Sequence, residues 1–86
     1  MLKLYGWYAC QDCLKLIEWL KSHDVPFEYY EMEDQPLQVG SLIGRVNGAQ
    51  SWKVPTLEYE GRWRPAKAFD PEETRRDLIA LGVPLE

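Results

Sequence analysis

The stretch "WYACQDCLKLIEWL", residues 7–20, places two cysteines three residues apart immediately before an apolar pattern with helical spacing. They are Cys10 and Cys13, the only cysteines in the chain. Steps of three and four residues connect Cys13 with the apolar residues up to Leu20, which predicts a helix over about 11–22. Cys10 then lies at or just before the first turn of this helix, and Cys13 lies one turn further in.

Further elements are predicted on both sides of this helix. Residues 2–5, "LKLY", alternate between apolar and polar as a short strand does, and Gly6 breaks the pattern. After the helix, the aromatic-rich residues 26–32 predict a second strand. Residues 36–47 have helical spacing of apolar side chains, although two glycines there disfavour a helix. Residues 54–65 predict two strands joined near Glu60 and Gly61.

The end of the chain carries a nearly complete set of helix signals. Asp70 is a capping residue, Pro71 fits the first helical position, and Glu73 stands three after the cap, as in a capping box. Gly82 marks the end of this helix.

The predicted order of elements is β-α-β-α-β-β-α, which places the chain in the α/β class. A helix connects the first two strands, so a right-handed parallel crossover is expected. The last two strands are expected to form an antiparallel hairpin. The sequence therefore predicts one domain, residues 1–86, with a mixed four-stranded sheet flanked by helices.

Composition and charge exclude several classes of function. The 86 residues are 45% hydrophobic and carry a net charge of −4, with no run of basic residues, so nucleic acid and anionic membranes are poor partners. No stretch reaches the roughly 18 consecutive apolar residues of a membrane span, and the first residues do not resemble a signal peptide. We therefore expect a cytoplasmic protein, in which a Cys-x-x-Cys pair is catalytic or metal-binding more often than structural.

The placement of the two cysteines favours redox chemistry. Unpaired amides and the helix dipole favour negative charge at Cys10, so its thiolate is expected to be stabilised. The spacing also brings the two sulfurs within bridging reach, with an exposed attacking Cys10 and a more buried resolving Cys13. Two alternatives stay open: a pair of small apolar residues, or half of a metal site. Structural zinc needs four ligands, however, and the single histidine, His23, lies a whole helix away, so no metal is expected.

A second motif, "KVPT" at residues 53–56, adds to the first. A proline that opens a strand is ordinary by itself. Together, the strand "LKLYG", the "CQDC" at a helix start, the strand "VPFEYYEME" and the segment "VPTLEYEG" resemble the glutaredoxin branch of the thioredoxin-like family. The resemblance covers nearly the whole chain and is weakest over residues 33–52.

This resemblance implies roles for particular residues. Cys10 resembles the nucleophilic cysteine and Cys13 the resolving one. Pro55 resembles the cis-proline that lies beside the dithiol in this family, and Val54 the residue that offers its backbone to a bound thiol peptide. The other residues expected around the same substrate- or glutathione-binding groove are Gly6, Tyr8, Trp52 and Asp70.

The implied function is that of a small thiol–disulfide oxidoreductase that reduces protein disulfides or glutathione mixed disulfides. No bound cofactor is required, and the expected electron donors are glutathione, thioredoxin reductase or both. Disulfide-containing proteins are the expected partners, and a monomer is the simplest state.

The sequence also departs from the pattern of the family. Gln11 and Asp12 stand where typical glutaredoxins carry proline and an aromatic residue. The charge of Asp12 disfavours a nearby thiolate, while it stabilises the start of the helix. The glycine pair of the family's glutathione site is missing from "AKAFDPEE", residues 66–73, although Asp70 can supply its acidic position.

Two alternative functions keep the same fold. One is an iron–sulfur carrier, although such glutaredoxins usually resemble Cys-Gly-Phe-Ser. The other is a non-catalytic binding module, related to the N-terminal domain of glutathione transferases or to arsenate reductases, whose chains are normally longer.

Overall fold

The computed structural model describes residues 1–85, which contain four strands, three α-helices and one short 3-10 helix. In chain order they are β1 (Leu2–Gly6), α1 (Gln11–Ser22), β2 (Phe27–Glu31), η1 (Met32–Asp34), α2 (Leu37–Val46), β3 (Thr56–Tyr59), β4 (Arg62–Arg64) and α3 (Pro71–Leu81). The predicted order of strands and α-helices is confirmed, and η1 is an addition to it.

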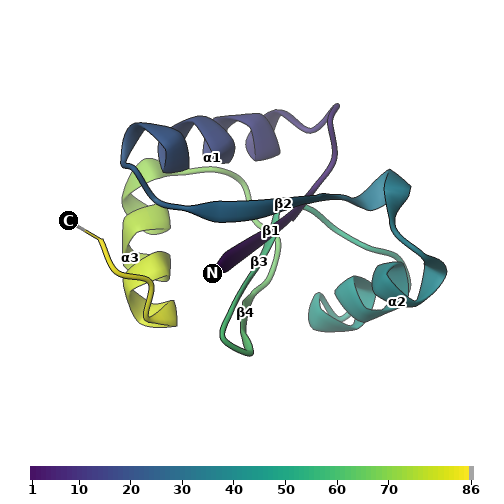
Figure 1. Ribbon diagram of the computed structural model, residues 1–86. Helices are drawn as coiled ribbons and strands as arrows, with labels where there is room; N and C mark the ends of the chain where they lie inside the picture. The colour runs from purple at the N-terminus through teal and green to yellow at the C-terminus, as the bar shows by residue number, and fades with distance from the viewer. Residues whose placement is uncertain (86) are drawn as a thin grey trace.

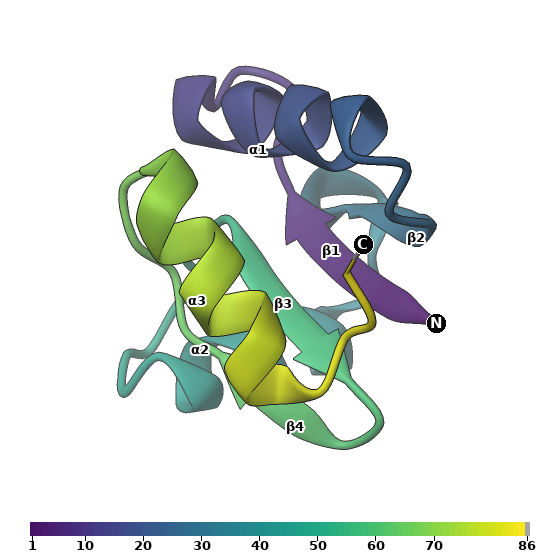
Figure 2. The ribbon, with the colours of Figure 1, turned by 90° about the vertical axis from the view of Figure 1, so that its left-hand side faces the viewer.

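The four strands form one mixed sheet in the order β2-β1-β3-β4. β1 pairs with β2 in parallel, whereas the β1–β3 and β3–β4 pairs are antiparallel. α1 and α3 cover one face of this sheet and α2 covers the other, as the two views in Figure 1 and Figure 2 show. The molecule is therefore a three-layer α/β/α domain, and the dithiol segment runs from β1 directly into α1.

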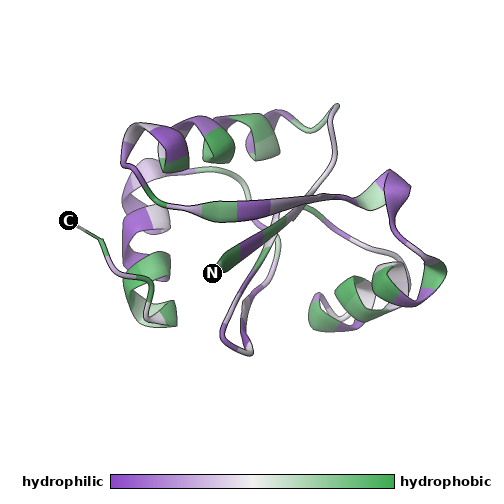
Figure 3. Cartoon of the chain, in the orientation of Figure 1, coloured by the Kyte–Doolittle hydropathy of each residue, from purple (hydrophilic) through white to green (hydrophobic). Residues whose placement is uncertain are grey.

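Each face of the sheet has its own apolar core. Figure 3 shows hydrophobic and hydrophilic residues alternating around α1, as expected for a helix that packs one side on a sheet. The buried residues of the α1/α3 side, here the major core, are Leu2, Leu4, Leu16, Trp19, Leu20, Val25, Leu57, Leu78, Leu81 and Val83. Those of the α2 side, here the minor core, are Tyr5, Met32 and Ile43.

The β3–β4 hairpin turns at Glu60 and Gly61, as the sequence predicts. Both residues have positive φ angles, 50° and 83° respectively. Two consecutive residues of this conformation are typical of the tight turns whose twist matches that of antiparallel strands. The turn keeps β4 against β3 and leads the chain back toward α3.

Three details differ from the sequence prediction. Gly6 does not lie beyond β1, as predicted, but belongs to it as its last residue, paired with Glu31. Met32 does not belong to β2; it begins η1, and its side chain is buried in the minor core. Asp70 caps α3 by accepting the N–H of Glu72 and not that of Glu73, whose carboxylate pairs with Lys67 at 3.3 Å, so the expected capping box is not observed among the described residues.

No helix within residues 1–85 is both long enough and apolar enough to cross a membrane.

Candidate active site

Cys10 is held at the N-terminus of α1 by hydrogen bonds on three sides. Its backbone N–H donates to Trp7 O at 3.0 Å, and its carbonyl accepts from Leu14 N at 3.1 Å. Its side chain acts as the N-cap of the helix, with Sγ accepting from the backbone N–H of Cys13 at 3.1 Å. A sulfur that accepts a helix amide is stabilised in its negatively charged form. Cys10 is half-buried, as a nucleophile with restricted access would be.

Cys13 has a different environment one turn later. Its side chain is fully buried, and both cysteines are free thiols. Burial raises the pKa of Cys13 from its ordinary value of 9.0 to about 12, and the side-chain hydrogen bond with Cys10 adds to this increase. The backbone N–H of Trp7 and the nearby charge of Asp12 act in opposite directions on it. The expected division into an accessible and a buried thiol is therefore present.

This asymmetry predicts selective alkylation of the reduced protein. Cys10, the more accessible thiol, is expected to react first with iodoacetamide, whereas Cys13 stays protonated and unreactive until the pH approaches about 12 or the chain unfolds. Because the folded-state pKa of Cys13 is raised, its contribution to stability is present below about pH 9 and is lost as the pH rises toward about 12. Mass spectrometry of alkylated peptides measures the selectivity, and equal labelling of both cysteines at neutral pH would contradict it.

Val54 and Pro55 lie at the same end of the sheet as the dithiol. Thr56, the first residue of β3, pairs with Tyr5, one residue before the end of β1. The two residues that precede Thr56 therefore extend toward the segment that leads from β1 to Cys10. The Val54–Pro55 peptide bond is cis, as the resemblance implied, and the Pro55 side chain is fully buried.

The two aromatic candidates have different surroundings. Tyr8 lies in the turn before Cys10, is 68% exposed and contacts the Trp7 ring edge-on. Trp52 packs against the minor core, and its Cδ1 lies 3.3 Å from the position that a Cβ of Gly40 would take. Trp52 therefore supports α2, whereas Tyr8 is available to a bound molecule.

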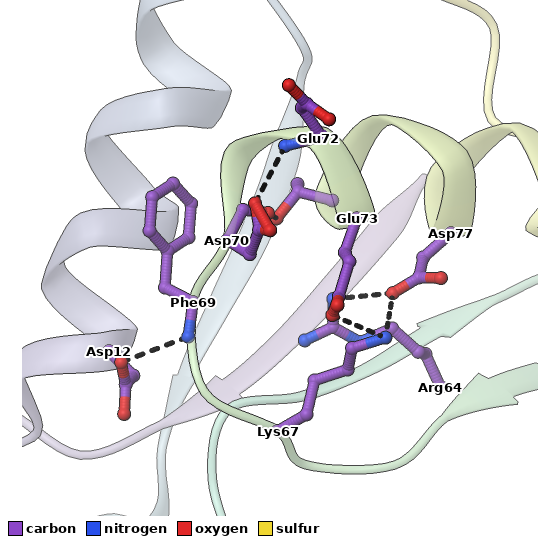
Figure 4. A network of polar contacts seen from close by, with 9 residues as sticks. Asp12, Arg64, Lys67, Phe69, Asp70, Glu72, Glu73 and Asp77 are labelled. Atoms are coloured by element: carbon purple, nitrogen blue, oxygen red, sulfur yellow. Dashed lines mark hydrogen bonds and ion pairs between the residues drawn. The ribbon is translucent and has the colours of Figure 1, made fainter.

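Asp70 caps α3, where its carboxylate accepts the N–H of Glu72 at 3.2 Å. Beside it, the carboxylate of Asp12 accepts the backbone N–H of Phe69 at 3.0 Å and thereby joins the first turn of α1 to the segment before α3 (Figure 4). From the sequence, Asp12 is expected to disfavour a nearby thiolate and to stabilise the start of the helix, and this contact with Phe69 is not predicted. The partners are 57 residues apart, and no local pattern signals their approach.

A network of charged side chains fixes the segment that carries Asp70 (Figure 4). Lys67 Nζ lies 2.7 Å from the carboxylate of Asp77, which also accepts from Arg64 at 3.3 Å. The hydrogen bond with Asp77 is the main reason that the pKa of Lys67 is raised, whereas burial lowers the pKa of Arg64. These contacts tie β4 and the following segment to α3, so Phe69 and Asp70 are positioned beside the dithiol helix.

Two substitutions separate the contact of Asp12 from its charge. Asp12→Asn keeps an oxygen acceptor for Phe69 N and loses only the charge in the first helical turn, at a cost of roughly 0.3–1 kcal/mol. Asp12→Ala also leaves the Phe69 amide without its partner, and is expected to cost about 1–3 kcal/mol. Urea unfolding measures the free energy of unfolding of both variants. Equal costs for the two would show that the hydrogen bond between Asp12 and Phe69 contributes nothing to stability.

Within residues 1–85, no three histidine, cysteine, aspartate or glutamate side chains converge on a point that could hold a metal ion.

Comparisons with known proteins identify the fold. No family model and no curated protein sequence matches the chain. Solved structures do match. The thioredoxin-like protein BC3987 superimposes with a TM-score of 0.67 at 20% identity, covering 88% of this chain and 97% of that one. Glutaredoxin grx-1 from Archaeoglobus fulgidus superimposes with a TM-score of 0.64 at 21% identity, and the match covers 87% of this chain and 82% of that one. Wheat glutaredoxin superimposes with a TM-score of 0.67 at 14% identity, and the match covers 99% of this chain and 83% of that one. The chain therefore has the thioredoxin-like fold in the form found in glutaredoxins, with Cys10 and Cys13 at the start of its first helix.

Proposed function

We propose that this protein is a small thiol–disulfide oxidoreductase that reduces disulfides with the Cys10–Cys13 pair. The observation that carries the proposal is the asymmetry of the pair: Cys10 Sγ accepts an amide at the helix N-terminus, while Cys13 lies buried within hydrogen-bond reach of it. The glutaredoxin-type fold supports the same chemistry, because proteins of this fold include glutaredoxins.

The reaction has two steps. The Cys10 thiolate attacks one sulfur of a substrate disulfide, so that a mixed disulfide forms and the first substrate thiolate leaves. Cys13 then loses its proton and attacks Cys10 Sγ, which releases the second substrate thiolate and leaves a Cys10–Cys13 disulfide. The substrate gains two electrons and the dithiol loses two, so an external donor must reduce the pair again.

Of the two candidate donors, we favour thioredoxin reductase over glutathione. The glycine pair expected at a glutathione site is missing before α3. In addition, the carboxylate of Asp12 accepts the Phe69 N–H, so this amide is not free to bind a carboxylate of glutathione, and the charge of Asp12 disfavours a second carboxylate beside it. A donor that presents a protein thiol needs no carboxylate site. We therefore propose that the protein acts as a monomer in the cytoplasm, where thiols are kept reduced.

The test compares donors and traps the intermediate. Oxidised protein is mixed with NADPH and either thioredoxin reductase or glutathione plus glutathione reductase, and NADPH consumption is followed. We expect turnover with thioredoxin reductase and little with glutathione.

In parallel, a Cys13→Ser variant is incubated with a disulfide substrate, and a mixed disulfide at Cys10 is expected by mass spectrometry. Efficient turnover with glutathione would reverse the choice of donor. Failure to trap any adduct at Cys10 would overturn the proposed function and favour a non-catalytic binding module.

A further inference from the structure

The resolving step of the proposed reaction requires a proton acceptor at Cys13. Its thiol is fully buried, so bulk water does not reach the sulfur directly. The thiolate is the attacking form, and a proton must therefore leave as the new sulfur–sulfur bond forms. A group on the neighbouring surface of the sheet would supply the path for this proton.

The register of β1 and β2 places two such groups on the face that α1 covers. Residues paired in parallel strands have side chains on the same face, and the pairs here are Leu4 with Tyr29 and Gly6 with Glu31. Leu4 belongs to the major core beneath α1. Tyr29 and Glu31 therefore face α1, and the Tyr29 hydroxyl donates to the Glu31 carboxylate at 2.9 Å.

The contact with Gly6 places the Tyr29 hydroxyl beside the end of β1 that leads to the dithiol. A Cβ on Gly6 would lie 2.8 Å from Tyr29 Cε1 and 3.3 Å from Tyr29 Oη, so the ring occupies the space that the absent side chain leaves. Gly6 is the last residue of β1, and the chain continues from it through the turn to Cys10. Cys13 faces the sheet at this same end, because it lies in the first turn of α1 with its side chain buried.

The electrostatics of Tyr29 agree with this placement. Its pKa is raised first by burial, then by the hydrogen bond with Glu31 and the charge of that residue, and further by Cys13 and Cys10. Tyr29 is 38% exposed, so this burial is partial, and the contributions of the two thiols agree with a ring that packs against the end of β1.

We propose that the Tyr29–Glu31 pair accepts the proton of Cys13 in the resolving step. As Cys13 Sγ attacks Cys10 Sγ, the S–H proton passes to Tyr29 Oη and the tyrosine proton passes to the Glu31 carboxylate. The bond between Cys10 and the substrate sulfur breaks, and the substrate leaves as a thiolate. Glu31, which is half-buried, then releases its proton to solvent. Reduction of the disulfide by the donor reverses the path. This inference rests on the proposed function.

The same strand offers a matched control on the opposite face of the sheet. The Tyr30 hydroxyl donates to the Glu28 carboxylate at 3.2 Å, also two residues away. Its ring stacks on Tyr5 of the minor core, with ring centroids 5.1 Å apart. Tyr30→Phe therefore removes an equivalent tyrosine–glutamate hydrogen bond that does not face the dithiol.

The test separates the two steps by stopped-flow and acid quench after mixing reduced protein with a small disulfide. Tyr29→Phe is expected to slow conversion of the mixed disulfide to the Cys10–Cys13 disulfide by about tenfold or more. It should also diminish the solvent deuterium isotope effect on that step. The rate of the first attack, measured in a Cys13→Ser background, should be unchanged, and Tyr30→Phe should leave both steps at the wild-type rate.

A second variant keeps the tyrosine and removes the final acceptor. Glu31→Gln retains an oxygen for the Tyr29 hydroxyl but is expected to slow resolution to a similar extent. If both variants resolve the mixed disulfide at the wild-type rate, the proton path is refuted while the proposed function stands. If the wild-type protein forms no Cys10–Cys13 disulfide at all, the proposed function fails instead.

Discussion

Cys10→Ser is expected to abolish disulfide reduction, with a loss of more than about a thousandfold in rate. A serine hydroxyl at the N-cap still accepts the Cys13 N–H, so the helix start and the fold are preserved. What is lost is the thiolate that forms the mixed disulfide. The measurement is the reduction rate of a small disulfide in the presence of the active donor.

Cys13→Ser is the informative companion to this variant. It should retain the first attack, accumulate the mixed disulfide at Cys10 and stop there unless a second thiol resolves it. The prediction for Cys10 would be contradicted if its serine variant kept appreciable activity while the Cys13 variant lost all of it, because the roles would then be exchanged.

Leu57→Ala is expected to reduce the free energy of unfolding by roughly 2–5 kcal/mol. Leu57 is fully buried in β3, where it pairs with Leu4 on one side and Arg64 on the other. Its removal leaves a cavity at the centre of the major core. A domain of 86 residues has a total stability of only about 4–13 kcal/mol. The loss is therefore a large share of the total.

Urea unfolding followed by circular dichroism measures this loss as a lower midpoint at an unchanged slope. Leu37→Ala is the control, because Leu37 is 86% exposed and its truncation should change stability by less than about 0.5 kcal/mol. Equal effects of the two substitutions would show that the major core is not centred where the structure places it.

The parts of the fold that were predictable are those with local signals. α1 begins and ends at the predicted residues because its apolar residues have helical spacing and Pro26, shortly after it, disfavours helical geometry at Val25. α3 likewise begins after Asp70 and ends at Gly82, which has the left-handed φ of 92° that favours glycine. These signals depend only on neighbouring residues and so can be read from the sequence.

The helix at residues 37–46 is predicted by the spacing of its apolar residues, against the low helix propensity of two glycines. Its two glycines argue against a helix by propensity alone. In the structure, a Cβ on Gly44 would lie 3.0 Å from Ala49 O, so glycine lets the following loop pack closely against α2. Gly40 similarly faces Trp52. The tertiary packing that offsets the cost of these glycines involves contacts the sequence pattern does not display.

The candidate site likewise has features that the sequence predicts and features that only tertiary packing sets. The Cys-x-x-Cys pair and its place at a helix start follow from spacing, and Pro55 follows from the resemblance. The contact of Asp12 with Phe69 and the approach of Tyr29 to Gly6 depend on how distant segments are brought together. Only the folded chain shows that the carboxylate of Asp12 binds the segment before α3 and that the Tyr29 ring packs against the end of β1.

The most direct test of the redox assignment is the equilibrium between the Cys10–Cys13 dithiol and disulfide in glutathione buffers of defined potential. Alkylation followed by mass spectrometry measures the fraction oxidised. The account predicts a reversible two-electron transition between the reduced pair and an intramolecular disulfide. If no Cys10–Cys13 disulfide forms at any potential, while both thiols react after unfolding, the pair is not redox-active and the central claim is wrong.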